Sequence, residues 1–149
     1  NDMATVTWGP FTLDPTTATT DAAESSGITT AAGTDYLITG VSANVTSLGD
    51  EYYDRDTYEF STGATTHEVA IVLSWADANN TDLDVILFPA NDFTEANVVE
   101  TGTYIGTTDD EVIRVMVQPS TTYWLWVATY ADAGVTLPVN YDVTICAFQ

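Results

Sequence analysis

The chain has 149 residues, with 22 acidic residues against two arginines and no lysine, so its formal net charge is −20. Nucleic-acid binding relies on lysine and arginine to neutralise phosphates, so this charge excludes nucleic acids and anionic membrane surfaces as partners. With 45% hydrophobic and 11% aromatic residues, the chain can bury the core of one domain and is not a disordered acidic tail.

The composition also indicates where the protein works. The 27 threonines and the absence of lysine are typical of an exported or high-salt protein. No apolar run approaches the roughly 20 residues of a membrane span, so we expect no membrane insertion. The chain opens without the features of a signal peptide, and we expect that one has been removed. The predicted location is extracellular or at the cell surface.

The first part of the chain differs from the rest. Residues 4–13 predict a strand, which Pro10 interrupts, as at a sheet edge or a bulge. Residues 14–34 consist mainly of Thr, Ala, Ser and Gly and hold too little apolar surface to pack, so they predict a linker. We therefore expect an extended N-terminal arm over 1–34 and a folded domain over 35–149.

Short β-type runs recur through the second part, and only residues 92–100 hold a candidate helical turn. Seven runs between turn-rich pieces predict an all-β fold, an antiparallel and jelly-roll-like β-sandwich. Period-two alternation assigns three apolar stripes to its core. The runs cover 36–41, 57–60, 67–75, 83–88, 112–117, 122–130 and 140–146, and the stripes are Val69, Ile71, Leu73 and Trp75; Tyr123, Leu125 and Val127; and Tyr141, Val143 and Ile145.

Three segments carry a resemblance to a known family. They are GDEYYDRDTYEF at 49–60, VLSWADANNTDLDVILF at 72–88 and TTYWLWVATYADAGVTLPVNYDVTI at 121–145. In this order they resemble the bacterial pre-peptidase C-terminal domain, the family that includes the collagen-binding domains of clostridial collagenases. The resemblance covers roughly three quarters of the chain. It implies a β-sandwich, secretion and a non-catalytic accessory role, often with calcium.

Two acidic clusters are candidate calcium sites. Calcium prefers six to eight oxygen ligands, and Asp50, Glu51, Asp54 and Asp56 offer four carboxylates just before a strand. In calcium-binding members of the similar family, this loop acts together with an upstream acidic segment, which is absent here. Asp82 and Asp84, with Asp77, could hold a separate ion. The alternative is that these acids are solvated loop residues and that Asp56 caps a turn.

The strand predicted at 122–130 carries aromatic residues on the face opposite to its core stripe. Trp124, Trp126 and Tyr130 stand where polar residues would be expected. Aromatic faces bury large areas at low entropic cost, so these three residues predict an interface with a ligand or another subunit. The alternative is that the N-terminal arm covers this face.

The sequence contains little that indicates a catalytic site. His67 is the only histidine and stands at a strand start, where a surface position is expected, and no serine has a nucleophile-elbow motif around it. Cys146 is the only cysteine and lies opposite a core stripe, as a small hydrophobic residue would. We therefore predict that the protein is not an enzyme.

The arm leaves two kinds of function open. One is a secreted module that binds an extracellular polymer through its aromatic face. The other is a structural subunit of an extracellular filament, in which the arm of one identical subunit fills a groove of the next and builds a homopolymer. In that case the arm residues that pack would be Val6, Trp8, Phe11 and Leu13. The arm could instead pair with its own sandwich as an edge strand.

Overall fold

A computed structural model gives the fold of the chain. It describes residues 2–7, 24–42, 52–76, 81–92, 95–102, 110–130 and 139–148. At residues 2–7, 24, 41–42, 52–55 and 95 the description extends to the backbone only.

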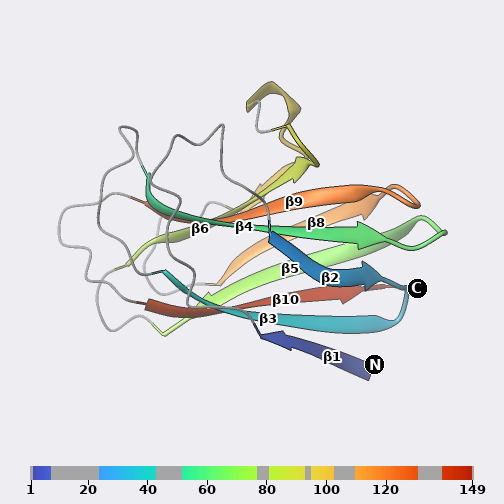
Figure 1. The fold of residues 1–149 in the computed structure, drawn as a ribbon, viewed down its shortest axis with the longest axis horizontal. Helices are drawn as coiled ribbons and strands as arrows, with labels where there is room; N and C mark the ends of the chain where they lie inside the picture. The colour runs from blue at the N-terminus through green and yellow to red at the C-terminus, as the bar shows by residue number, and fades with distance from the viewer. Residues whose placement is uncertain are drawn as a thin grey trace.

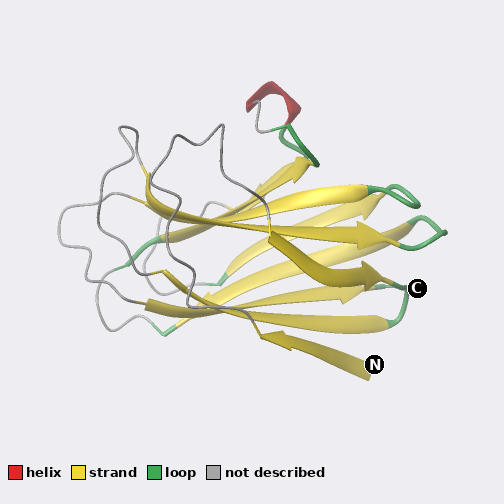
Figure 2. Cartoon of the chain, in the orientation of Figure 1, coloured by secondary structure: helices red, strands yellow, loops and turns green. Residues whose placement is uncertain are grey.

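The described residues form ten strands and one short 3-10 helix (Figure 1). Most strands run along the long axis of the view, and short described turns join them at its right-hand end (Figure 2). The elements are β1 (Asp2–Thr7), β2 (Glu24–Thr30), β3 (Thr34–Ser42), β4 (Tyr52–Thr62), β5 (His67–Trp75), β6 (Leu83–Pro89), η1 (Glu95–Asn97), β7 (Glu100–Gly102), β8 (Glu111–Val117), β9 (Thr122–Tyr130) and β10 (Val139–Ala147). The seven strands predicted in the second part of the chain are confirmed, and η1 lies in the segment predicted to hold a helical turn. Of the strand predicted at 4–13, residues 4–7 belong to β1, and residues 8–13 lie outside the described residues.

The strands make two five-stranded sheets that pack face to face. The first sheet has the order β1-β3-β10-β5-β8, and the second has the order β2-β4-β9-β6-β7. All pairings are antiparallel except those of β1 with β3 and β2 with β4, which are parallel edge pairings. The predicted all-β sandwich is therefore confirmed.

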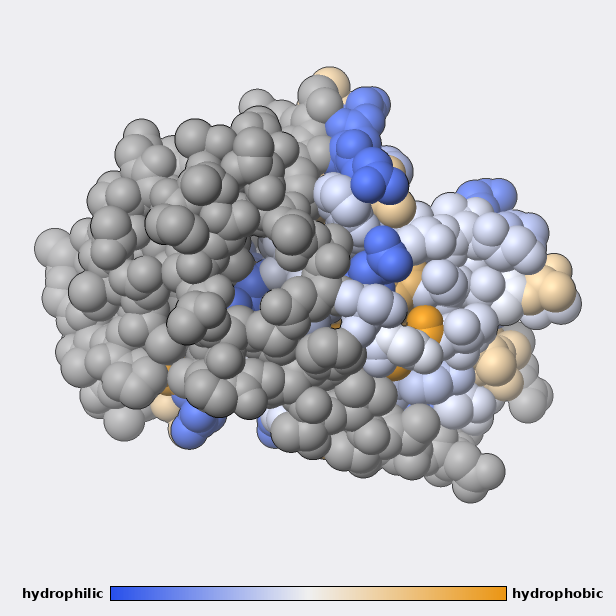
Figure 3. Space-filling model, viewed as in Figure 1, coloured by the Kyte–Doolittle hydropathy of each residue, from blue (hydrophilic) through white to orange (hydrophobic). Residues whose placement is uncertain are grey.

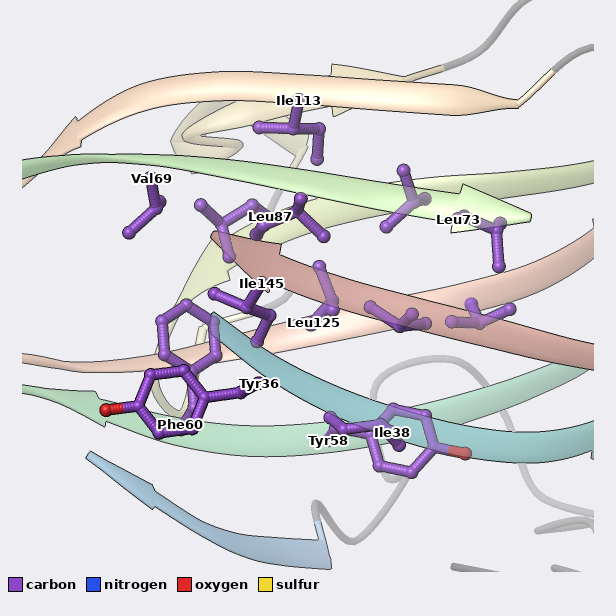
Figure 4. Close-up of a cluster of buried hydrophobic side chains, with 14 of the residues drawn as sticks. Tyr36, Ile38, Tyr58, Phe60, Val69, Leu73, Leu87, Ile113, Leu125 and Ile145 are labelled. Carbon is purple, nitrogen blue, oxygen red and sulfur yellow. The ribbon is translucent and has the colours of Figure 1, made fainter. Parts of the chain in front are cut away.

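The core lies between the sheets and is built by the predicted stripes. Val69, Ile71, Leu73, Val143 and Ile145 are fully buried, because alternation turns one side of each strand inward. Figure 4 shows side chains from β3, β4, β5, β6, β8, β9 and β10 meeting in this layer. Burial of this apolar layer is the main stabilising term of the fold.

Strand β2 corrects the prediction of a linker over residues 14–34. That prediction is wrong for Glu24–Thr30, which forms the edge of the second sheet. Its single large apolar residue, Ile28, enters the core, and the buried Ser26 hydroxyl donates to the Glu59 carbonyl at 2.7 Å. Gly27, with φ +67°, allows the register shift between Ser25 and Thr29. Backbone pairing and hydrogen-bonded hydroxyls thus replace the apolar stripe that the prediction required.

The N-terminal strand β1 lies beside β3 of the same chain, with Val6 in register with Ile38. Of the two arrangements that we considered for the arm, the structure therefore shows the one in which it pairs with its own sandwich as an edge strand. The other arm residues, Trp8, Phe11 and Leu13, lie outside the described residues.

The surface of the described part agrees with an acidic, solvent-facing protein. Figure 3 shows mostly hydrophilic to neutral residues there, with small separate hydrophobic spots. The exposed large apolar side chains of this part are Val112, Met116, Tyr130 and Phe148. No described helix has the length and hydrophobicity that a membrane span requires.

Candidate functional site

The sandwich has two ends of different chemistry. At the turn end, Ala31–Gly33 joins β2 to β3, residues 63–66 join β4 to β5, and residues 118–121 join β8 to β9. At the opposite end, here called the acidic end, β5 and β9 finish and β4, β6, β8 and β10 begin. Three buried acids lie toward this acidic end: Asp56, Asp84 and Glu111.

The structure describes only part of the first predicted calcium cluster. Asp50 and Glu51 lie outside the described residues, and Asp54 is described only by its backbone, in register with Thr129. Asp56 is buried near the start of β4, with 6% of its surface exposed. It is thus the one member of the first cluster whose side chain the structure describes.

Asp56 and Asp84 point to opposite sides of the second sheet. Asp56 is in register with Val127 and Asp84 with Ala128, and successive residues of a strand face opposite ways. Asp82 precedes β6, two residues before Asp84. Among the described side chains, no three acids, histidines or cysteines converge on one point. These residues alone do not fit a calcium ion, and calcium stays a prediction from the sequence.

The Asp56 carboxylate belongs to a buried network with two tyrosines, one from each sheet. Tyr141 of β10 donates a short hydrogen bond across the sandwich to Asp56 Oδ2. The Tyr58 Oη lies 2.5 Å from the Tyr141 Oη. Because the single hydroxyl proton of Tyr141 is directed to Asp56, Tyr58 must donate to Tyr141. Burial raises the pKa of Tyr141 well above its ordinary value, and the Asp56 charge adds to this, so the hydroxyl keeps its proton at neutral pH.

Gly40 makes room for the Tyr141 ring. It lies opposite Tyr141 in the register of β3 and β10. A Cβ atom at Gly40 would lie 2.3 Å from Tyr141 Cζ, which no real contact tolerates. A glycine inside a strand often marks such a close approach, and here it permits the buried network.

The predicted aromatic face is the outer side of β9. Its three residues differ in burial and in their contacts. Trp126 is 6% exposed and packs with Ile86 and Phe88, and Val98, just after η1, packs against this cluster. Trp124 is half-buried, and its indole Nε1 donates to Glu59 Oε2 at 2.9 Å. Tyr130 is 37% exposed. A segment of the same chain therefore packs beside Trp126, while Trp124 and Tyr130 reach the surface.

His67 is not the surface residue that we expected, since it is 4% exposed. Its Nδ1 lies 2.8 Å from the Thr65 carbonyl, which can only accept, so Nδ1 carries a proton. In the neutral ring, Nε2 then accepts from the Thr30 hydroxyl at 2.9 Å. Both ring nitrogens are used to join β2, β5 and a turn, as in a structural histidine.

Cys146 is half-buried on the outer side of the first sheet. Burial raises the pKa of its thiol, and the neighbouring Asp35 carboxylate raises it further. The thiol is therefore protonated at neutral pH and is not an activated nucleophile.

The described residues define a β-sandwich of ten strands, in which the buried polar groups Asp56 and His67 are bonded within the fold. It is similar to the pre-peptidase C-terminal domain of a collagenase from Bacillus anthracis, with 16% sequence identity and a TM-score of 0.55, covering 84% of this chain and 97% of that one. It is also similar to PliG, a periplasmic inhibitor of g-type lysozyme from Aeromonas hydrophila, with 12% identity and a TM-score of 0.48, covering 98% and 97%. No protein-family model and no curated protein matches the chain.

The first likeness confirms the fold of the predicted family. At 16% identity it concerns the fold alone, and ligands do not follow from it.

Proposed function

We propose that this chain is a non-catalytic binding module of an extracellular or cell-envelope protein, and that it holds an extended polymer along the outer side of β9. The fold of a collagenase's pre-peptidase C-terminal domain supports the accessory role. The acidic, lysine-free composition supports the location.

One observation carries the choice of surface. Trp124 and Tyr130 share the outer side of β9 and are six residues apart, which is about 20 Å along a strand. Trp126 and Ala128, which lie between them on the strand, are buried. The accessible rings of Trp124 and Tyr130 are therefore separated by residues that a ligand cannot reach. Two anchors at this distance suit an extended chain better than a small molecule.

Glu59 prepares one of these anchors. Its carboxylate accepts the indole N–H of Trp124 and so fixes the orientation of the ring before any ligand arrives. A preoriented aromatic side chain loses little entropy on binding. The local charge is negative, so a polymer that is neutral or basic is favoured over an acidic one.

Sedimentation with insoluble polymers tests the proposal. We expect the wild type to be retained by at least one of collagen, chitin and cellulose, and the double variant Trp124→Ala, Tyr130→Ala to lose at least about tenfold in affinity. Phe148→Ala is the matched control, because Phe148 is 38% exposed, close to the 37% of Tyr130, but follows β10 of the first sheet. Equal retention of all three proteins, or of none, would overturn the proposal.

Light scattering on the same samples separates this function from self-assembly. A polymer-binding module stays at the mass of one chain, 16.0 kDa, when no polymer is present. Growth into regular assemblies that stops when residues 1–15 are deleted would favour the filament subunit instead.

A further inference from the structure

A hollow of about 380 Å³ opens at the acidic end of the first sheet, where β5 finishes and β10 begins. Small-molecule sites usually have volumes from about 300 Å³ upward, so this hollow can take one or two small rings. Its described lining consists of Ser74, Trp75, Ala76, Asn140, Tyr141 and Asp142.

The register of β5 and β10 places an apolar and a polar pair side by side. Trp75 lies opposite Tyr141, and Ser74 lies opposite Asp142, so each pair has its Cβ atoms about 5 Å apart. The two pairs belong to opposite sides of the sheet, but residues of both line the hollow at its end. A ligand there would therefore lie beside Trp75 and beside the polar residues Ser74, Asn140 and Asp142.

The aromatic part of the hollow is fixed. The Trp75 indole Nε1 donates to the Thr81 carbonyl at 3.0 Å, which holds the ring in place. Tyr141 is 2% exposed and its hydroxyl is directed to Asp56, so Trp75 is the aromatic side chain that a ligand could reach. Polar groups stand on the rim, because Asn140 and Asp142 are both exposed.

The charge of the lining limits the ligand. Asp142 is the one charged side chain among the described residues of the lining. Of the two arginines, Arg114 is the one whose side chain is described, and it is in register with Ala70, four residues or about 13 Å from Ser74 along β5. Arg114 is also paired with Glu68 at 3.0 Å. Nothing described near the hollow neutralises a phosphate, sulfate or carboxylate, so anionic ligands are disfavoured.

We propose that this hollow binds a neutral saccharide unit. The C–H face of a pyranose ring packs on the Trp75 indole, while its hydroxyls donate to the Asp142 carboxylate and exchange hydrogen bonds with Asn140 and Ser74. A single ammonium group fits less well, because one indole and one carboxylate do not enclose it and most of the volume would stay empty. The inference does not depend on the surface of β9 proposed above.

Titration followed by ¹H–¹⁵N NMR tests the inference on the whole chain. The probes are cellobiose, N,N′-diacetylchitobiose and maltose, with choline as the cationic comparison. We expect at least one disaccharide to shift the indole N–H signal of Trp75, and choline to leave that signal unchanged. A shift with choline alone, or no shift with any sugar, would overturn the inference.

Variants then assign the groups. Asp142→Asn should weaken saccharide binding about tenfold, because it removes a charged acceptor, and Trp75→Phe should weaken it several-fold by shrinking the platform. Glu100→Gln removes an exposed charge from the second sheet and should change binding less than about twofold. Because Asp142 is exposed, the Asn variant should keep its melting temperature. Equal saccharide binding by Asp142→Asn and Glu100→Gln would contradict the assignment. The double variant Trp124→Ala, Tyr130→Ala tests the β9 surface alone, so its loss of polymer retention would not bear on the hollow.

Discussion

The two ends of the sandwich use the same residue type, tyrosine, for different purposes. At the turn end, the Tyr36 hydroxyl donates to the Thr29 carbonyl at 2.9 Å and accepts from the Ala31 N–H at 3.2 Å. The Tyr123 hydroxyl accepts from the Gln118 N–H at 3.0 Å. These neutral bonds satisfy backbone groups that short turns would otherwise leave without partners.

At the acidic end, the Tyr58 hydroxyl bonds to the Tyr141 hydroxyl, which in turn donates to the buried Asp56 carboxylate. A buried charge without partners is expensive, so these tyrosines act as its solvation shell. The comparison teaches that a buried tyrosine at the turn end supports a loop, whereas at the acidic end it makes a buried charge tolerable. Mutations at the acidic end should therefore cost more.

Gly40→Ala should give the largest effect, because the new methyl group would overlap the Tyr141 ring and displace it from Asp56. We expect a loss of about 3 kcal/mol or more in the free energy of unfolding, measured by urea denaturation. Gly27→Ala is the matched control: its φ of +67° imposes strain, but nothing lies within 4 Å of the new atom, so about 1 kcal/mol is expected. A smaller loss at Gly40 than at Gly27 would show that the Tyr141 ring can move freely.

Tyr141→Phe should come next. It keeps the ring but leaves Asp56 without its short hydrogen bond, and a bond to a buried charge contributes about 2–3 kcal/mol. Tyr123→Phe, the counterpart at the turn end, removes a neutral bond to an exposed turn that water can replace, so about 1 kcal/mol or less is expected. Equal losses in urea denaturation would remove the distinction between the two ends.

Alkaline pH should sharpen the same contrast. The pKa of Tyr141 is raised in the folded protein, mainly by burial and then by the Asp56 charge. A raised pKa contributes stability that is fully present below the ordinary tyrosine pKa of about 10 and is lost as the pH rises through the folded value. The wild type should therefore lose stability above pH ~10 at a slope of up to about 1.4 kcal/mol per pH unit more than Tyr141→Phe. Parallel curves from urea midpoints between pH 8 and 11 would contradict this.

How far the sequence could predict these features depends on sequence distance. The core stripes of β5, β9 and β10 follow from local alternation, and the structure confirms them. The bond between Tyr141 and Asp56 joins residues 85 positions apart and has no local signal. The sequence predicted Asp56 to be a calcium ligand or a turn cap, and the pairing of the two sheets was needed to show its tyrosine partner.

Two other elements show why composition misled. The Thr- and Ser-rich strand β2 was missed because its hydroxyls, in Ser26 and Thr30, bury with hydrogen-bond partners, which apolar periodicity does not detect. The outward aromatic residues of β9 were found, but only the structure shows that Val98 packs against the cluster around Trp126. Packing between distant segments decides whether such residues are buried, and the local periodicity of a single sequence does not reveal that packing.

The smallest effect is expected for the exposed charge pair near the turn end. Arg114 Nε donates to Glu68 Oε1 at 3.0 Å, with 60% and 37% of the side chains exposed, and Arg114 also lies 5.2 Å from the centre of the Phe148 ring. Water and salt screen such a pair, so Glu68→Gln should change the free energy of unfolding by about 0.5 kcal/mol or less. The net charge of −20 opposes even this loss, because the variant removes one of the repelling acids. A loss as large as that of Tyr141→Phe, measured at low salt, would mean that exposed and buried charges of this protein are equally costly to disturb.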